Sequence, residues 1–252
     1  MKKLVIFFLG LSTLFSCSSD NDEQPKTTSV TINFTHSWED TPVTSADFND
    51  IKFTNEHGEE LSIERLRYII SNIHLTSTSG PSFKINDYLL VDLGEEQNLT
   101  FTTETTIPNG TYNLAFTFGF TDEDNQDGIY LDLNSTSFNV PMMMGGGYHY
   151  MQFDGKFIDV NDAEVGFNYH AIRAVDNSDP DNLILKDTSF GVTLSEVVVV
   201  NNTATMTVNM NIAEWFKNPN EWDLNQLNQM LMPNYEAQLL MSENGKTVFS
   251  LQ

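Results

Sequence analysis

Alternation of apolar and polar residues runs through most of this chain and predicts β-strands. The run Val30 to Trp38 alternates strictly, which is typical of a half-buried strand. Side chains two residues apart share a face, so His36 and Trp38 point inward with Val30. Tyr112 to Phe120 alternates in the same way. Further short strands are expected at 48–53, 68–75, 88–93, 99–101, 148–151, 167–172, 190–194, 196–200, 204–212 and 248–251. Short strands separated by turn signals predict an all-β fold, an antiparallel β-sandwich.

One segment near the C-terminus departs from the strand pattern. Ala213 to Phe216 favours a helical turn. Apolar residues at helical spacing then predict a second short helix that stops at Pro233; they are Leu224, Leu227 and Leu231. Both helices are expected to cap one end of the sandwich.

The first residues have the form of a lipoprotein signal peptide, residues 1–16. Lys2 and Lys3 precede an apolar stretch, Leu4 to Leu14, that is too short to span a bilayer. The sequence L-F-S-C that ends at Cys17 has the form of a lipobox, so Cys17 is expected to carry the lipid. It is the single cysteine of the chain, which excludes a disulfide framework.

The residues after Cys17 change in composition at about residue 28. Residues 17–27 are polar and acidic and are expected to form a disordered tether. Residues 28–252 are expected to form one β-sandwich domain. The formal net charge of −23 excludes a nucleic-acid-binding protein, because phosphate recognition requires clustered Lys and Arg. It also argues against electrostatic docking on membranes, so the lipid anchor is the expected membrane attachment.

The richest chemistry lies between Pro141 and Ala174. Three glycines, 145–147, allow a tight turn and precede His149 on a strand-like run. A second strand-like run carries His170, and the triplet 142–144 is all methionine. Imidazole and thioether groups together suit copper. The alternative is that the histidines and methionines fill a core; for the methionines, packing is the first expectation and a thioether ligand the second.

Several motifs resemble one known family, and the resemblance covers nearly the whole chain after residue 28. The matching segments are G-G-G-Y-H-Y-M (145–151), G-F-N-Y-H (166–170), M-N-I-A-E-W-F-K-N-P-N-E-W-D-L-N (210–225), L-R-Y-I-I-S-N-I-H-L (66–75), P-N-G-T-Y (108–112) and F-T-F-G-F (116–120). Together they are similar to the MbnP-like family of copper-binding proteins, in its Bacteroidetes lipoprotein form.

The resemblance implies an extracytoplasmic copper-binding protein that holds or passes on copper, with a di-haem peroxidase (MbnH-like) as a partner. The expected copper ligands are His36, His149 and His170, which lie on predicted strands. In related proteins the site can include a tryptophan oxidised to kynurenine, and Trp38 is the candidate here. The chain departs from the family at Phe138, where a tryptophan is expected. An acidic run after the lipid cysteine also resembles an export signal, which implies an outer-membrane lipoprotein that is periplasmic or cell-surface exposed.

A second function class is kept as an alternative: a surface β-sandwich that binds a glycan or a protein, with structural calcium. Glu123, Asn125 and Asp127, followed by Gly128, resemble the opening of a calcium loop. The twelfth position, Asn134, cannot supply the bidentate carboxylate of such a loop. An enzyme is not expected, because G-x-S-x-G, H-E-x-x-H and phosphate-loop motifs are missing from the sequence.

Overall fold

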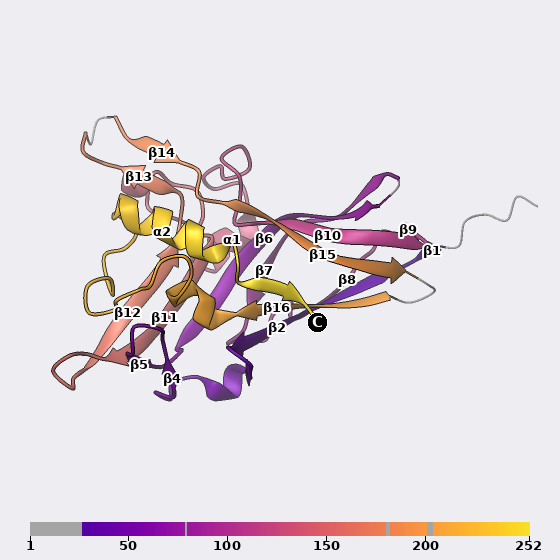
Figure 1. The fold of residues 1–252 in the computed structure, drawn as a ribbon. Helices are drawn as coiled ribbons and strands as arrows, with labels where there is room; N and C mark the ends of the chain where they lie inside the picture. The colour runs from indigo at the N-terminus through magenta and orange to yellow at the C-terminus, as the bar shows by residue number, and fades with distance from the viewer. Residues whose placement is uncertain (1–26, 79, 180–181, 201–203) are drawn as a thin grey trace, which may run out of the picture.

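The computed structural model describes residues 27–252, apart from residues 79, 180–181 and 201–203 and the side chains of 195–200. Most of the regular secondary structure in this part of the chain is β-strand and lies in two curled sheets, so the predicted all-β fold is confirmed (Figure 1). The first sheet has the order β15–β10–β6–β11–β5–β4, with β7 paired to β6 and β12 paired to β11. Its strands are β4 (Phe53–Thr54), β5 (Glu60–Leu61), β6 (Arg65–Ser77), β7 (Ser82–Asp92), β10 (Gly110–Phe118), β11 (Met151–Ile158), β12 (Glu164–Ala171) and β15 (Phe190–Val200).

The second sheet has the order β17–β16–β2–β3, with β8 paired to β2. Its strands are β2 (Val30–Trp38), β3 (Thr41–Val43), β8 (Thr100–Thr102), β16 (Ala204–Asn211) and β17 (Phe249–Leu251). Pairing is antiparallel in both sheets except between β2 and β16, which run parallel. Two small pairs complete the strands: β1 (Thr27–Thr28) with β9 (Ile107–Pro108), and β13 (Ala174–Asp176) with β14 (Ile184–Lys186).

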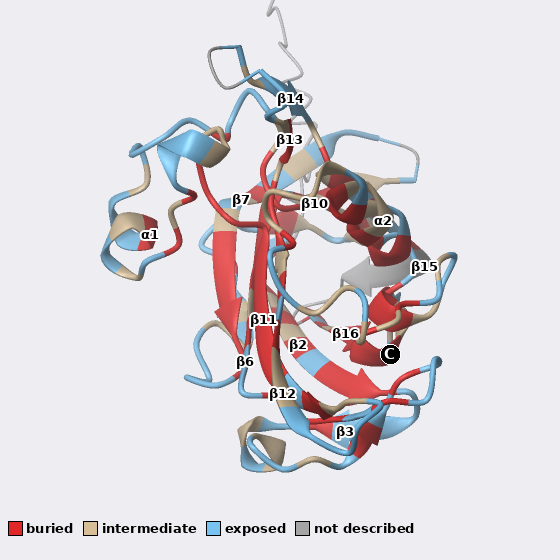
Figure 2. Cartoon of the chain, turned by 90° about the vertical axis from the view of Figure 1, so that its left-hand side faces the viewer, coloured by how far each residue is buried: buried red, intermediate tan, exposed pale blue. Residues whose placement is uncertain are grey.

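Aromatic side chains fill the space between the two sheets. Tyr68 and Phe118, from the first sheet, meet Phe249 of the second, with ring centroids 6.0 Å apart in each case. The inward set on β10 is the alternating one that the sequence predicted, since Tyr112, Leu114, Phe116 and Phe118 are buried. Figure 2 shows that burial is concentrated on β6, β11 and the inner side of the helix α2.

The helical segments differ in part from the prediction. The turn at 213–216 exists as the 3-10 helix η3 (Ile212–Phe216), but the helix expected over 224–231 is wrong, because residues 221–233 form turns. The C-terminal helix α2 (Tyr235–Gly245) follows Pro233 instead of ending there. Asn234 caps it, because its side chain accepts a hydrogen bond from the amide of Ala237.

Two local features were also not predicted. The strand expected over 48–53 is reduced to β4, and the 3-10 helix η1 (Ser45–Asp47) precedes it. Between β10 and β11 the chain forms a long covering segment, residues 121–150, with α1 (Leu131–Ser135) and the 3-10 helix η2 (Met142–Met144). This segment covers the outer face of β6 and β11, since Arg67 on β6 and Gln152 on β11 donate hydrogen bonds to the carbonyls of Thr136 and Ser137.

Candidate metal centre

A row of polar side chains crosses the outer face of β6, β11 and β12. Arg67, Gln152 and His170 are register partners on these three strands and therefore share a face. Two residues further along, Arg65, Asp154 and Asn168 form a second row on that face. The alternate residues of the same strands, such as Phe153 on β11, point into the core.

The glycine turn before β11 positions His149 against this face. Gly147 has φ +77, and a Cβ there would lie 2.5 Å from the Asn125 side-chain oxygen, so the turn requires glycine. That oxygen accepts a hydrogen bond from the amide of Tyr148 at 2.8 Å. The next residue, His149, donates both its backbone N–H and its ring N–H to the carbonyl of Phe138, each at 2.9 Å. Its ring orientation is therefore fixed by the backbone.

His149 and His170 meet edge to face, with ring centroids 5.3 Å apart. A carbonyl oxygen can only accept, so Nδ1 of His149 carries the proton and Nε2 presents the lone pair. Nε2 of His149 has no hydrogen-bond partner within the described part of the chain. Burial lowers the pKa of His149 from 6.5 to about 4, so this imidazole is neutral near pH 7.

Asp154 fixes the ring of His170 in the same manner. Nε2 of His170 lies 2.7 Å from Asp154 Oδ1, which also accepts a 2.6 Å hydrogen bond from Asn168. Arg65 Nε donates to Asp154 Oδ2 at 2.5 Å. Burial opposes the ionisation of Asp154, but the bonds from His170 and Asn168 and the charge of Arg65 lower its pKa to about 2. As a carboxylate it only accepts, so His170 keeps its proton on Nε2 and presents Nδ1.

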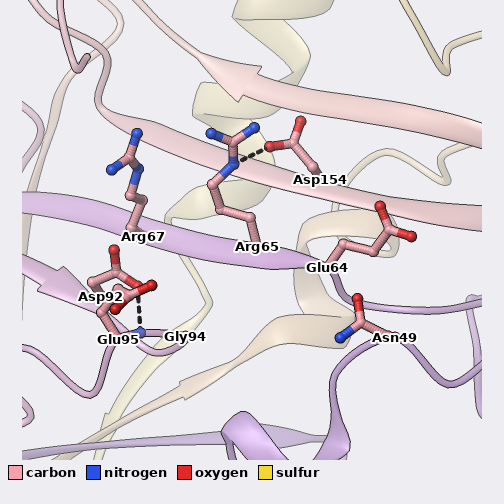
Figure 3. Close-up of a pocket in the computed structure, with 8 residues that line it drawn as sticks. All are labelled: Asn49, Glu64, Arg65, Arg67, Asp92, Gly94, Glu95 and Asp154. Atoms are coloured by element: carbon pink, nitrogen blue, oxygen red, sulfur yellow. Dashed lines mark hydrogen bonds and ion pairs between the residues drawn. The ribbon is translucent and has the colours of Figure 1, made fainter. Parts of the chain in front are cut away.

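An open cavity of about 530 Å³ lies beside Asp154 on the outer face (Figure 3). Arg65 and Arg67 reach into it from β6, and carboxylates of Asp92 and Glu95 stand below Arg67. Arg67 is also held from the other side, because its guanidinium lies 5.2 Å from the ring centroid of Phe138 and its Nε donates to Gln152 at 2.8 Å. The cavity gives water access to the carboxylate that orients His170.

His36 does not join this pair. It is buried, as its position in the alternating strand predicted, and its Nε2 lies 3.1 Å from the hydroxyl of Tyr68. Tyr68 follows Arg67 on β6, so it points into the core while Arg67 points outward. The expected convergence of three histidines is therefore wrong: the pair is on the outer face of the first sheet, and His36 is between the sheets.

Trp38 also lies away from the pair. Its ring stacks on Phe53 at 5.0 Å, and its Nε1 donates to the carbonyl of Thr54 at 3.1 Å. The aromatic side chain next to the pair is Phe138, with its ring centroid 5.7 Å from that of His149. The position at which the resemblance implies a tryptophan is therefore beside His149, and in this chain it holds a phenylalanine.

The predicted calcium loop is used for a different purpose. The side-chain oxygen of Asn125 accepts the Tyr148 amide, and Asp127 Oδ1 accepts the Gly147 amide at 3.2 Å. Glu123 is exposed. Two of the three candidate ligands thus hold the glycine turn, which leaves the calcium proposal without support.

The methionine triplet is not core packing. Met142 and Met143 are 68% and 76% exposed, and Met144 is half-buried at the end of η2. Cys17 lies outside the described residues. Within the described residues, no helix is long and apolar enough to cross a membrane.

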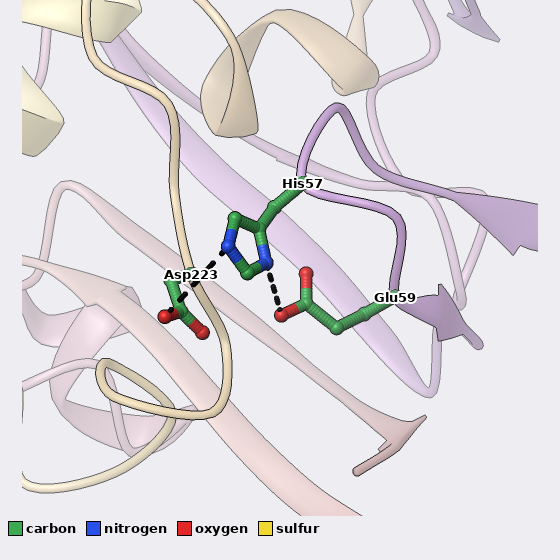
Figure 4. A group of neighbouring side chains, drawn as sticks. All are labelled: His57, Glu59 and Asp223. Carbon is green, nitrogen blue, oxygen red and sulfur yellow. Dashed lines mark hydrogen bonds and ion pairs between the residues drawn. The ribbon is translucent and has the colours of Figure 1, made fainter. Parts of the chain in front are cut away.

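A second cluster, which the sequence did not indicate, surrounds the exposed side chain of His57. Its Nδ1 lies 2.8 Å from Glu59 and its Nε2 3.8 Å from Asp223 (Figure 4). The hydrogen bond to Glu59 raises the pKa of His57. The imidazole lies between two carboxylates, so the cluster joins the turn at 55–59 to the loop at 222–227.

The comparisons with known proteins agree with the fold and with the earlier resemblance. The family model described as MbnP matches residues 27–233. The chain belongs to the MbnP family. Among solved structures, MbnP from Methylosinus trichosporium is similar with a TM-score of 0.59 and 14% sequence identity, over 90% of this chain and 98% of that one. At this identity the likeness concerns the fold. A comparison with curated proteins gives no match.

Proposed function

We propose that this member of the MbnP family binds one copper ion with Nε2 of His149 and Nδ1 of His170. The observation that carries the proposal is the paired anchoring of the two rings. Each donates one N–H to a fixed oxygen, Phe138 O or Asp154 Oδ1, and keeps its other nitrogen free of hydrogen bonds within the described residues. Metal-binding histidines are oriented by such bonds from the far ring nitrogen.

The electrostatics of the pair favour a cation. His149 is neutral near pH 7, so a proton does not compete for its lone pair. The ionised Asp154 accepts a hydrogen bond from His170 and thereby makes the other ring nitrogen of His170 a stronger metal ligand. Imidazole nitrogens suit copper, and Cu(I) accepts few ligands with little demand on geometry.

The proposed role is non-catalytic: the protein holds copper outside the cytoplasm or passes it on. The lipobox at Cys17 supports attachment to the outer membrane through acyl chains, on its periplasmic or outer face. The di-haem peroxidase implied by the family is a proposed partner. Because Phe138 occupies the position beside the pair, copper binding here does not depend on an oxidised tryptophan. Mass spectrometry is expected to find the peptide of Trp38 unmodified, and a mass increase there would contradict this.

Copper titration of the purified protein tests the proposal. The wild type is expected to bind about one copper ion per chain. His149→Ala and His170→Ala each remove one ligand and are expected to weaken binding by at least about tenfold. The matched control is His74→Ala, because His74 is outside the pair and bonds to the carbonyl of Asn72. Equal copper affinity in all four proteins would refute the assignment.

A further inference from the structure

A cleft of about 300 Å³ has His170 in its lining. Three of its lining residues are methionines, Met144, Met230 and Met232, and Asn168 lies beside His170 in the lining. Met144 ends the 3-10 helix η2 within the covering segment, whereas the other two belong to the loop before α2. Thioether groups from two distant parts of the sequence therefore gather around one of the two proposed copper ligands.

Both methionine-bearing segments are fastened to β12 around His170. The buried side chain of Gln238 donates to the carbonyl of His170 at 2.9 Å and to that of Leu231 at 3.0 Å. The amide of Asn168 donates to the carbonyl of Asn228 at 2.8 Å. These bonds fix the loop that carries Met230 and Met232 against the strand.

The other segment is fixed by Arg173, two residues beyond the end of β12. Arg173 Nη2 donates to the carbonyl of Gly145 at 2.9 Å, directly after Met144. Gly145 has φ +89, and this left-handed residue ends the 3-10 helix of the methionine triplet. The position of Met144 relative to His170 is thus constrained by the side-chain hydrogen bond from Arg173 to the backbone beside Met144.

Core packing does not explain Met230. Its side chain is 76% exposed, so it gains little from burial. Its backbone has φ +57, a conformation that costs free energy for any residue other than glycine. A large apolar side chain held at an exposed, strained position beside a proposed ligand indicates a functional constraint.

We propose that this methionine cleft admits copper as Cu(I) and supplies a thioether ligand to the ion held by the histidine pair. The inference rests on the proposed copper site and adds the oxidation state and the route of entry. Thioether sulfur is a soft ligand that selects Cu(I), whereas imidazole alone accepts both oxidation states. The cleft therefore makes the site selective for Cu(I) over Cu(II) and over harder divalent ions.

The test is a triple variant, Met144→Leu, Met230→Leu and Met232→Leu, which keeps side-chain volume and removes the sulfur atoms. Cu(I) affinity is measured without oxygen by competition with a chromophoric chelator, and Cu(II) affinity separately. The variant is expected to bind Cu(I) at least about tenfold more weakly, with Cu(II) affinity changed less than about twofold.

The matched control is the double variant Met142→Leu and Met143→Leu. These methionines are exposed, and neither lines the cleft; the sulfur of Met142 lies over Gly146 instead. The control is expected to keep wild-type Cu(I) affinity. A triple variant that also keeps it would overturn the inference while leaving the histidine site in place.

X-ray absorption of the Cu(I)-loaded wild type gives a readout that is independent of how the variants fold. The expected spectrum has a sulfur scatterer together with nitrogen scatterers, and a spectrum with nitrogen alone would overturn the methionine ligand. Absence of any copper binding by the wild type would overturn both this inference and the proposed function.

Discussion

Replacing Asp154 with asparagine tests whether the carboxylate orients His170 for metal binding. Asp154 accepts three hydrogen bonds, from His170, Asn168 and Arg65. An asparagine that turns its oxygen to His170 must turn its NH₂ group to the donor on Arg65. One donor is then left without an acceptor, or His170 loses its anchor and its preferred tautomer.

The magnitude follows from the type of bond. A partner that orients a metal-binding histidine is generally worth ten- to a hundredfold in metal affinity. We therefore expect copper affinity to fall by a factor in this range, which corresponds to about 1.4–2.7 kcal/mol. Because the pKa of Asp154 is lowered from 3.8 to about 2, the ionised carboxylate stabilises the folded state at pH 7 by on the order of 2 kcal/mol. Asp154→Asn removes this contribution.

Copper titration at pH 7 and urea unfolding of the metal-free protein measure the two effects separately. The matched control is Glu164→Gln on the neighbouring strand β12, which removes one carboxylate that pairs with Lys156 at 2.8 Å and does not touch His170. The control is expected to keep copper affinity. If Asp154→Asn bound copper as tightly as the wild type, the reasoning on ring orientation would be refuted.

Two further predictions concern stability. Burial lowers the pKa of His36 and of His149 from 6.5 to about 4, so below pH 6.5 the unfolded chain binds protons that the folded chain does not. The free energy of unfolding should therefore fall as the pH is lowered from 6.5 to 4, by on the order of 3 kcal/mol for each histidine; urea unfolding across this range that gave a constant value would contradict it. Gly119→Ala should destabilise the fold by at least about 2 kcal/mol in thermal or urea unfolding, because Gly119 has φ +78 and a Cβ would lie 2.4 Å from the ring of Tyr150. Gly191→Ala, with no atom within 4 Å of its Cβ, is the control, and equal losses in the two variants would argue against this packing.

The sequence was sufficient to predict the two-histidine pair because its members come from consecutive strands. β11 and β12 form a local antiparallel pair in which Gln152 faces His170, and His149 lies two residues before β11. Short-range pairing of this kind follows from alternation and turn signals alone. Asp154 was missed, because it alternates with apolar residues in the same way as Gln152 and Lys156, and this pattern does not single it out.

The error at His36 has a physical reason. Alternation correctly predicted that His36 points inward, but it does not say which sheet a strand joins or which face of the other sheet carries a site. β2 belongs to the second sheet and pairs with β16, which is more than 150 residues away in the chain. The helix expected at Leu224, Leu227 and Leu231 was wrong for a related reason. These leucines lie in turns and pack against the core, and their helical spacing alone does not distinguish this arrangement from a helix.

The most direct measurement of the central claim is an anomalous difference map at the copper absorption edge, from crystals of the copper-loaded protein. One strong peak is expected in contact with both His149 and His170. A peak beside His36 and Tyr68, or at the cluster of His57 and Glu59 with the histidine pair empty, would contradict it.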